Sequence, residues 1–144
     1  MLDLSPSETR WMALDVGSKT IGLALTDPLK ITVRPLLTLQ RRSLADDCQK
    51  LLETARLHGV NKLIVGRPLH LDGTPSDILE LVEEFVSEIA RRSDVPVEWV
   101  DERLSSKEAE ILMAEAGVAV SERRKRRNEF AAAIILRRYL EEVS

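Results

Sequence analysis

The stretch "ALDVGSKTIGLALTD", residues 13–27, decides the fold because two apolar runs are separated here by a short polar turn. We expect strands at Met12–Val16 and Thr20–Thr26, joined through "GSK" as a hairpin. Asp15 lies at the end of the first run. A strand that only fills a core needs no carboxylate at its tip, so Asp15 is the first candidate for a functional residue.

The rest of the chain alternates between strand and helix patterns. Three further strands are expected at Val33–Leu39, at "NKLIVG" (61–66) and within "VPVEWVDERL" (95–104), the last ending near Asp101. Four helices are expected: from the cap Ser43 to His58, from Asp77 to Arg92, from a capping box of Ser105 and Glu108 to before Gly117, and a last one opened by Asn128 and Glu129. Loops are expected at "RPLHLDGTPS" (67–76) and at the basic run 123–127.

This order of elements predicts the architecture. Two antiparallel links followed by strand–helix alternation indicate an α/β fold in which helices flank a mixed five-stranded sheet. No internal repeat or low-complexity linker divides the 144 residues, so residues 1–144 are expected to form one domain.

The composition argues against several classes of protein. No apolar run is long enough to span a bilayer, and the N-terminus lacks the pattern of a secretory signal, so a cytoplasmic protein with no membrane partner is expected. The single cysteine, Cys48, excludes an internal disulfide, and its apolar neighbours at helical spacing indicate a packed core thiol. A net charge of −3 argues against a generic nucleic-acid coat protein, although "RRKRR" concentrates five cations.

Acids gather where the predicted elements end or begin. Asp15 ends the first strand, Asp101 and Glu102 end the last, and Asn128 and Glu129 open the final helix. Sites in such sheets form beyond the ends of central strands. A cluster of carboxylates suits Mg²⁺ or Mn²⁺, which prefer oxygen ligands and activate water in phosphodiester cleavage.

Four segments of the chain together resemble one known family. They are "ALDVGSKTIGLALTD", "LIVGRPLHLDG", "VDERLSSKEAE" and "RRNEFAAAIILRRYL". In this order and spacing they are similar to the four sequence blocks of the YqgF/RuvX family, Holliday-junction-resolvase-like proteins that are also described as pre-16S rRNA nucleases. The resemblance implies an RNase H-like fold, a divalent metal cofactor (Mg²⁺ or Mn²⁺) and a nucleic-acid substrate, RNA or DNA.

The resemblance also implies the roles of particular residues. It makes Asp15 the first metal-binding acid and points to Glu102, with Asp101 beside it, as the second. Neighbouring residues of a strand face opposite sides, so only one of the pair is expected to enter the site, and Glu102 is the preferred candidate. The family pattern D-x-x-A-A has its third acid where this chain has Asn128, so Asn128 becomes a neutral candidate ligand. Glu129 is the alternative acid, but it lies about 100° further around the helix.

Candidate substrate-binding residues lie around these acids. Gly17 and Lys19 either approach a phosphate or only make a tight turn with a solvated charge, and Arg67 and His70 lie in a loop suited to substrate contact. The five cations Arg123, Arg124, Lys125, Arg126 and Arg127 are expected to grip phosphates from a loop, the alternative being a solvated charged surface. With two Trp, one Tyr and two Phe, backbone recognition is expected rather than base stacking.

The sequence leaves a second function open. A nucleic-acid-binding or ribosome-associated factor without catalytic activity would keep the same fold, and Asn128 favours it. "DVGSKTIG" also resembles the phosphate-binding hairpin of the sugar kinase, actin and Hsp70 superfamily, but that superfamily places ATP between two such domains and this chain supplies one. Also open are RNA or DNA as substrate, endonucleolytic or exonucleolytic action, and a monomer or homodimer.

Overall fold

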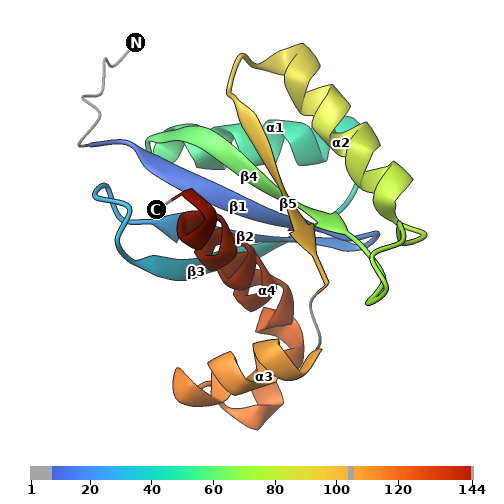
Figure 1. The fold of residues 1–144 in the computed structure, drawn as a ribbon. Coiled ribbons are helices and arrows are strands. Elements are labelled where there is room, and N and C mark those ends of the chain that lie inside the picture. The colour runs from blue at the N-terminus through green and yellow to red at the C-terminus, as the bar shows by residue number, and fades with distance from the viewer. Residues whose placement is uncertain (1–7, 104–105, 144) are drawn as a thin grey trace.

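A five-stranded mixed sheet forms the centre of the computed structural model, which describes residues 8–103 and 106–143. Its strands are β1 (Arg10–Val16), β2 (Thr20–Thr26), β3 (Val33–Gln40), β4 (Val60–Pro68) and β5 (Val97–Glu102). The order across the sheet is β3-β2-β1-β4-β5 (Figure 1). β1 pairs antiparallel with β2, and β2 with β3, whereas β1, β4 and β5 are parallel. The predicted hairpin and mixed sheet are therefore confirmed.

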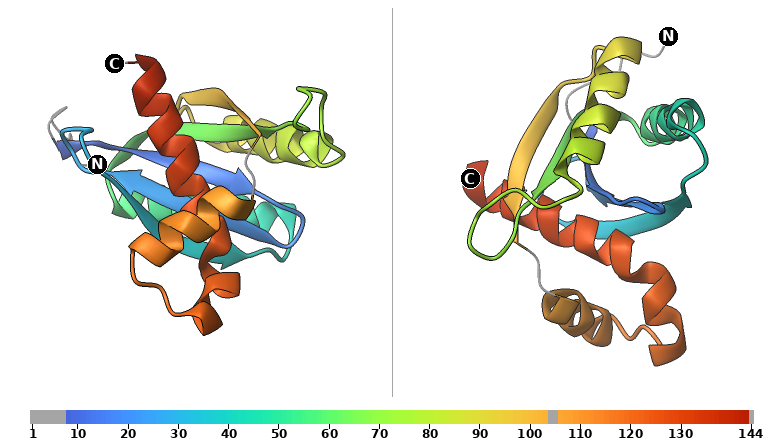
Figure 2. Two further views of the ribbon diagram at one scale, coloured as in Figure 1. Left: turned by 60° about the horizontal axis from the view of Figure 1, so that its bottom comes forward. Right: turned by 90° about the vertical axis from the view of Figure 1, so that its right-hand side faces the viewer.

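Four helices surround the sheet: α1 (Leu44–Leu57), α2 (Leu79–Arg92), α3 (Ser106–Glu115) and α4 (Val120–Val143). α1 and α2 cover one face, α4 crosses the other, and α3 packs beside the first half of α4 (Figures 1 and 2). Local sequence explains several ends. The Ser43 hydroxyl accepts a hydrogen bond from the Asp46 amide at 3.1 Å, and Gly117 takes the left-handed conformation, φ 76°, that ends α3.

Alternation along the strands divides the core into two. Met12, Leu14 and Val16 of β1 pack toward α1 and α2, in a cluster that also buries Cys48. Ala13, Ala24 and Ile64 face the other way and pack against Ala132 and Ile135 of α4. Small side chains on this second face let α4 approach the strands closely. The predicted core position of Cys48 is confirmed, and burial raises the pKa of its thiol to about 11.

α4 approaches β2 most closely at Gly22. A Cβ on this residue would collide with the backbone carbonyl of Asn128 and lie 2.7 Å from the amide nitrogen of Glu129. Gly22 also pairs with Asp15 in the β1–β2 ladder. The glycine therefore lets the helix backbone touch the sheet one strand away from Asp15, and it places Asn128 near that acid.

The structure corrects two predicted boundaries. α4 begins at Val120, so Asn128 and Glu129 lie inside the helix rather than at its start, and Arg123–Arg127 is helical rather than a loop. Arg and Lys are good helix formers, and Glu110 of α3 pairs with two of these cations, which offsets their mutual repulsion.

Smaller differences lie at other ends. Arg67 and Pro68, predicted as loop, are the last residues of β4, where they pair with Asp101 and Glu102. The predicted cap Ser105 lies outside the described residues. Within the part of the chain that the structure describes, no helix is long and apolar enough to cross a membrane.

Candidate active site

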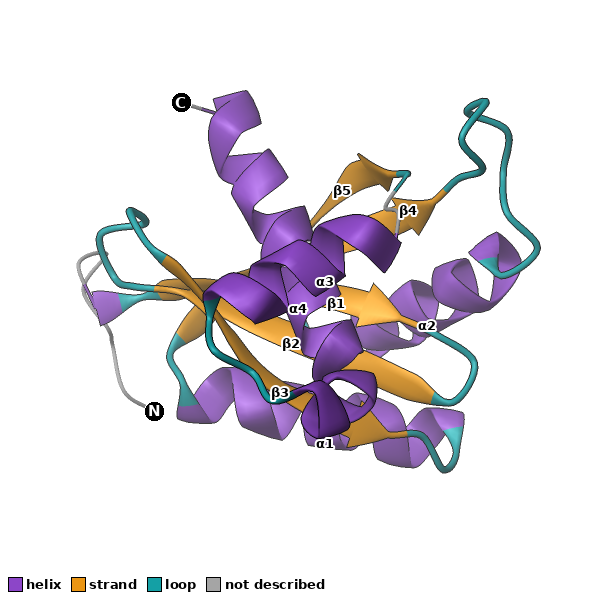
Figure 3. Ribbon diagram, turned by 90° about the horizontal axis from the view of Figure 1, so that it is seen from below, coloured by secondary structure: helices purple, strands orange, loops and turns teal. Residues whose placement is uncertain are grey.

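Asp15 and Glu102 lie at the same end of the sheet and on the same face. β1, β4 and β5 are parallel, so their carboxyl ends meet at one edge, beside the β1–β2 turn and the β4–α2 loop (Figure 3). Asp15 shares the α4 face with Ala13, and Glu102 shares it with Val100, both members of the core under α4. The structure thus brings together the two acids that the sequence analysis favoured.

Gly66 of β4 occupies the space between the two acidic strands. A Cβ on Gly66 would lie 2.6 Å from Oε2 of Glu102 and 2.6 Å from Cδ1 of Ile135. The Glu102 side chain therefore extends from β5 across β4, in the direction of β1 and Asp15. Any larger residue at position 66 would fill the path that this side chain takes.

The two carboxyls are desolvated and repel each other. Burial raises the pKa of Asp15 from 3.8 to about 6. Burial is also the largest cause at Glu102, whose pKa rises from 4.5 to about 8, with further increases from the charges of Asp15 and Glu108. The Arg138 guanidinium acts in the opposite direction on this pKa. A pair of partly buried acids with raised pKa values, at the ends of two strands separated only by β4, is typical of functional sites.

Arg138 and Glu108 form the outer wall of this site. Nη2 of Arg138, in α4, lies 3.2 Å from Oε2 of Glu108, in α3. Both residues line a groove of about 340 Å³ between the two helices. This ion pair ties α3 to α4 beside Glu102 and places one positive and one negative charge near that acid.

Asn128 reaches the site from the sheet-facing side of α4. Its Nδ2 donates a hydrogen bond to Oγ1 of Thr20, the first residue of β2. This bond fixes the amide and leaves its oxygen as a neutral potential ligand. Glu129, in contrast, is buried and forms an ion pair with Nε of Arg126 at 2.5 Å. The cation beside Glu129 already compensates its charge, so Glu129 is a poor substitute for the absent third acid.

Asp101 and Arg67 lie on the other face of the sheet. They are neighbours in the β4–β5 ladder, and Nε of Arg67 lies 3.8 Å from Oδ1 of Asp101. The Arg67 guanidinium also lies 4.9 Å from the ring centroid of Trp99, whose side chain packs toward α1 and α2. The structure does not bring these two residues together with Asp15 and Glu102.

The β1–β2 turn is built by backbone hydrogen bonds. The Gly17 amide donates to the Thr20 carbonyl at 2.9 Å, and Arg41 binds the carbonyls of Gly17 and Lys19. The Gly17 amide is thus used inside the turn, while the Lys19 side chain is exposed at its tip. His70 is exposed in the β4–α2 loop at the same end of the molecule.

The five cations of α4 are not equivalent. Arg123 and Arg127 pair with Glu110 at 3.4 and 3.0 Å, and Arg126 pairs with Glu129. Arg124 and Lys125 are exposed on the outer side of the helix. Two of the predicted phosphate-binding side chains therefore join α4 to α3, a third pairs within α4, and two project into solvent.

The donors at the site are oxygen atoms. Among the described residues no group of three or more His, Cys, Asp or Glu side chains is arranged to hold a metal ion. The potential ligand set consists of the two carboxylates and the Asn128 amide oxygen, a chemistry that suits Mg²⁺ or Mn²⁺ and not a thiolate-preferring metal.

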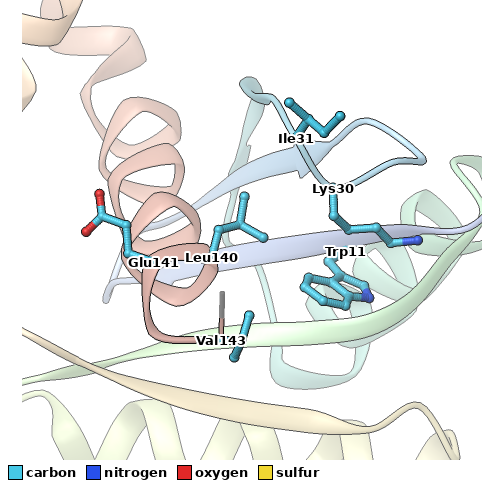
Figure 4. Close-up of a pocket in the computed structure, with 6 residues that line it drawn as sticks. All are labelled: Trp11, Lys30, Ile31, Leu140, Glu141 and Val143. Carbon is cyan, nitrogen blue, oxygen red and sulfur yellow. The ribbon is translucent and has the colours of Figure 1, made fainter.

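A separate hollow of about 440 Å³ lies at the opposite end of β1. Trp11 and Lys30 lie on one side of it and Leu140 and Val143 of α4 on the other (Figure 4). Nζ of Lys62 lies 4.2 Å from the Trp11 ring centroid and donates to the Tyr139 hydroxyl at 2.9 Å. These contacts fix the end of α4 to the sheet and lie away from the candidate acids.

Sequence reasoning missed several residues that shape the site. They are Thr20, Gly22, Gly66, Glu108 and Arg138. The only signal in the sequence was a glycine inside each of two apolar strands, which indicates a close approach of another group. Arg138 and Glu108 are thirty positions apart, and no local pattern predicts their pairing.

Comparison with known proteins identifies the family. The family model RuvX, described as Holliday junction resolvase, matches residues 9–142. A relative from Symbiobacterium thermophilum, described as "Putative pre-16S rRNA nuclease", is 45% identical over 128 residues, which are 89% of each chain. A relative with the same description from Moorella thermoacetica is 40% identical over 132 residues, covering 92% of this chain and 94% of its own.

Two solved structures share the fold at low identity. Thermus thermophilus RuvC in complex with a Holliday junction substrate has a TM-score of 0.60 and 15% identity, covering 94% of this chain and 97% of its own. Fowlpox virus resolvase in complex with Holliday junction DNA has a TM-score of 0.61 and 9% identity, covering 93% and 98%. The sheet flanked by helices is thus RNase H-like, and the chain belongs to the RuvX (YqgF) family.

Proposed function

We propose that this protein is a divalent-metal-dependent nuclease that hydrolyses phosphodiester bonds in structured nucleic acid. The observation that carries the proposal is the pair of partly buried, mutually repelling carboxyls, Asp15 and Glu102, at the ends of β1 and β5. Such a pair is costly without a compensating cation, and a divalent ion offsets both the desolvation and the repulsion. Membership of a nuclease family supports the same conclusion.

In this proposal Asp15 and Glu102 hold Mg²⁺ or Mn²⁺, and the Asn128 amide oxygen is a neutral third ligand. The ion would supply activation of water and stabilisation of the leaving oxygen. Gly66 leaves the path for Glu102, and Thr20 orients the Asn128 amide. Because Asn128 adds no negative charge, metal binding should be weaker than with three carboxylates, and catalysis should demand more metal.

The substrate proposed first is the precursor of 16S rRNA, because the similar proteins are described as nucleases for that RNA. A Holliday-junction-like or single-stranded DNA is the alternative, supported by the fold shared with two resolvases. In either case the exposed Lys19, Arg124 and Lys125 would contact the phosphate backbone.

A second candidate function is a nucleic-acid-binding or ribosome-associated factor without catalysis. Two observations favour it: the third acid of the family pattern is Asn128, and the neighbouring Glu129 is occupied by Arg126. Such a factor would bind nucleic acid through the same cations and would cleave no substrate at any metal concentration.

Cleavage assays on a panel of precursor rRNA, single-stranded DNA and four-way junctions, over a range of Mg²⁺ and Mn²⁺, separate these functions. Asp15→Asn should abolish cleavage, and Asp101→Asn is the matched control because it removes a carboxylate on the other face of the sheet. Metal-dependent cleavage that survives Asp15→Asn would exclude this site. No cleavage by the parent protein on any substrate, together with retained binding, would favour the binding factor.

A further inference from the structure

Arg103 follows Glu102 directly and lies against the β4–α2 loop. A Cβ on Gly73 would lie 2.8 Å from Nη2 of Arg103 and 3.2 Å from its Cζ, so the guanidinium rests on the backbone of this glycine. Gly73 has φ 88°, a conformation that other residues rarely adopt. Because residue 73 has no side chain, the Arg103 guanidinium can lie directly against the loop backbone. A side chain at position 73 would occupy the same space.

The loop beneath Arg103 is held by its own hydrogen bonds. The Gly73 amide donates to the His70 carbonyl at 2.9 Å, and the His70 amide donates to the Thr74 carbonyl at 2.8 Å. The Asp72 carboxylate accepts hydrogen bonds from the amide and hydroxyl of Thr74, which lower its pKa. A guanidinium that already packs against such a turn loses less conformational entropy on binding a ligand than a fully mobile arginine side chain does.

The charge of Arg103 differs from that of several arginines near the site. Within the described residues, carboxylate partners within 4.0 Å are found for Arg67, Arg123, Arg126, Arg127 and Arg138. No carboxylate in the same described part lies within that distance of Arg103, whose side chain is exposed. Among the residues that the structure describes, Arg103 is thus a positioned cation with no carboxylate at ion-pair distance.

Arg103 also has a fixed relation to the candidate metal site. It is joined to Glu102 by one peptide bond, and the Leu69 amide donates to the Glu102 carbonyl at 2.9 Å, which attaches the start of the loop to the end of β5. Arg103 and the β4–α2 loop therefore lie directly beyond the end of β5, next to Glu102.

We propose that Arg103 binds a backbone phosphate of the substrate strand, next to the phosphodiester that is cut. This proposal rests on the nuclease function proposed above. A guanidinium presents a planar set of donors that matches two phosphate oxygens, which a lysine ammonium cannot reproduce. The alternative is that Arg103 only packs against the loop and contributes nothing to substrate binding.

The experiment measures binding of labelled RNA and DNA oligonucleotides by Arg103→Gln and Arg103→Lys in an Asp15→Asn background, where no cleavage interferes. Arg56→Gln is the matched control, because it removes one exposed charge from α1 on the other face of the sheet. We expect Arg103→Gln to weaken binding about tenfold and to reduce the slope of log affinity against log salt by about 0.7–0.9. Arg103→Lys should keep most of the slope and recover only part of the affinity.

Two further measurements keep the outcomes distinct. The first is Mn²⁺ binding by Arg103→Gln in a protein that keeps Asp15, measured by calorimetry without nucleic acid. It should equal Mn²⁺ binding by the parent protein, because Arg103 is proposed to bind phosphate and not metal. Thermal unfolding shows whether each variant folds. If Arg103→Gln folds and its affinity and salt slope equal those of Arg56→Gln, the proposal is overturned. A parent protein that binds no Mn²⁺ would overturn the proposed nuclease, while the oligonucleotide data would still decide the role of Arg103.

Discussion

Ionisation of Asp15 and Glu102 lowers the free energy of unfolding, as the raised pKa values of these two residues indicate. The folded state holds a proton on Asp15 and Glu102 more tightly than the unfolded chain does, because burial disfavours the charged forms. Without metal, the free energy of unfolding should therefore fall as the pH rises from 3.8 to about 6 at Asp15, and from 4.5 to about 8 at Glu102. The contribution of these two acids to stability is therefore lost as the pH rises. A carboxylate in an ion pair has the opposite pH dependence, because its contribution is lost as the pH falls.

The first prediction concerns Asp15→Asn in metal-free buffer. The neutral amide removes the cost of the buried charge, so at about pH 8 the variant should be more stable than the parent by on the order of 1–3 kcal/mol. The difference should shrink toward about pH 4, where Asp15 is protonated. Urea unfolding at both pH values measures it, with Asp101→Asn as control. A variant less stable than the parent at both pH values would contradict the burial argument.

The second prediction concerns metal affinity. Carboxylate ligands must lose their protons to bind a cation, so Mn²⁺ affinity should rise between about pH 6 and pH 8, as Glu102 ionises. Calorimetric titration across this range measures the change. Glu102→Gln should bind weakly at every pH and remove the rise above about pH 6. An affinity of the parent protein that is independent of pH would show that Asp15 and Glu102 are not the ligands.

At the scale of elements, glycines decide how closely the parts of the site approach. Gly66 leaves room for both Glu102 and Ile135. The third prediction is that Gly66→Ala weakens Mn²⁺ binding at least tenfold and lowers stability by about 1–3 kcal/mol, because the added methyl group displaces both side chains. Adding Ile135→Val to this variant should restore part of the stability, since it relieves one of the two clashes. Metal binding should stay weak, and a full recovery of binding would argue against the path assigned to Glu102.

The sequence predicted those elements whose pattern is local. The hairpin around "GSK", the apolar β4 and the acids at the ends of β1 and β5 all follow from residues close together in the chain. The start of α4 does not follow from local residues. Five cations in a row repel one another in a helix, and acids such as Glu110, which tertiary structure brings near, offset this repulsion. The approach of α4 to Gly22 is likewise a contact between distant segments.

The position of Asn128 within α4 leads to the fourth prediction. Asn128 lies inside the helix on the side that faces the sheet, so Asn128→Asp should add a carboxylate beside Asp15 without moving the backbone. We expect tighter Mn²⁺ binding and faster cleavage at limiting metal. Glu129→Gln should leave metal binding unchanged and lower stability, because it removes the partner of Arg126. Loss of metal binding in Glu129→Gln would instead make Glu129 the third acid.

At the scale of the whole molecule, the five cations of residues 123–127 divide into paired and exposed side chains. The protein is acidic overall, with a net charge of −3, yet α4 carries five cations in a row. Three of them are paired with acids: Arg123 and Arg127 join α4 to Glu110 of α3, and Arg126 pairs with Glu129 within α4. Arg124 and Lys125 are exposed and have no carboxylate at ion-pair distance within the described residues, so the freely available positive charge is smaller than the sequence suggests.

The fifth prediction tests this division of the five cations. Replacing Arg124 and Lys125 with Gln should weaken nucleic-acid binding for all sequences alike and reduce the salt slope by about 1.4–1.8, because two phosphate contacts are lost. Arg91→Gln with Arg92→Gln is the control of equal charge, since both residues end α2 on the other face of the sheet. Arg123→Gln and Arg127→Gln should mainly lower the unfolding temperature, because they break the contacts between α3 and α4. If these two paired arginines change the salt slope as much as Arg124 and Lys125 do, their ion pairs open on binding and the whole run contacts the substrate.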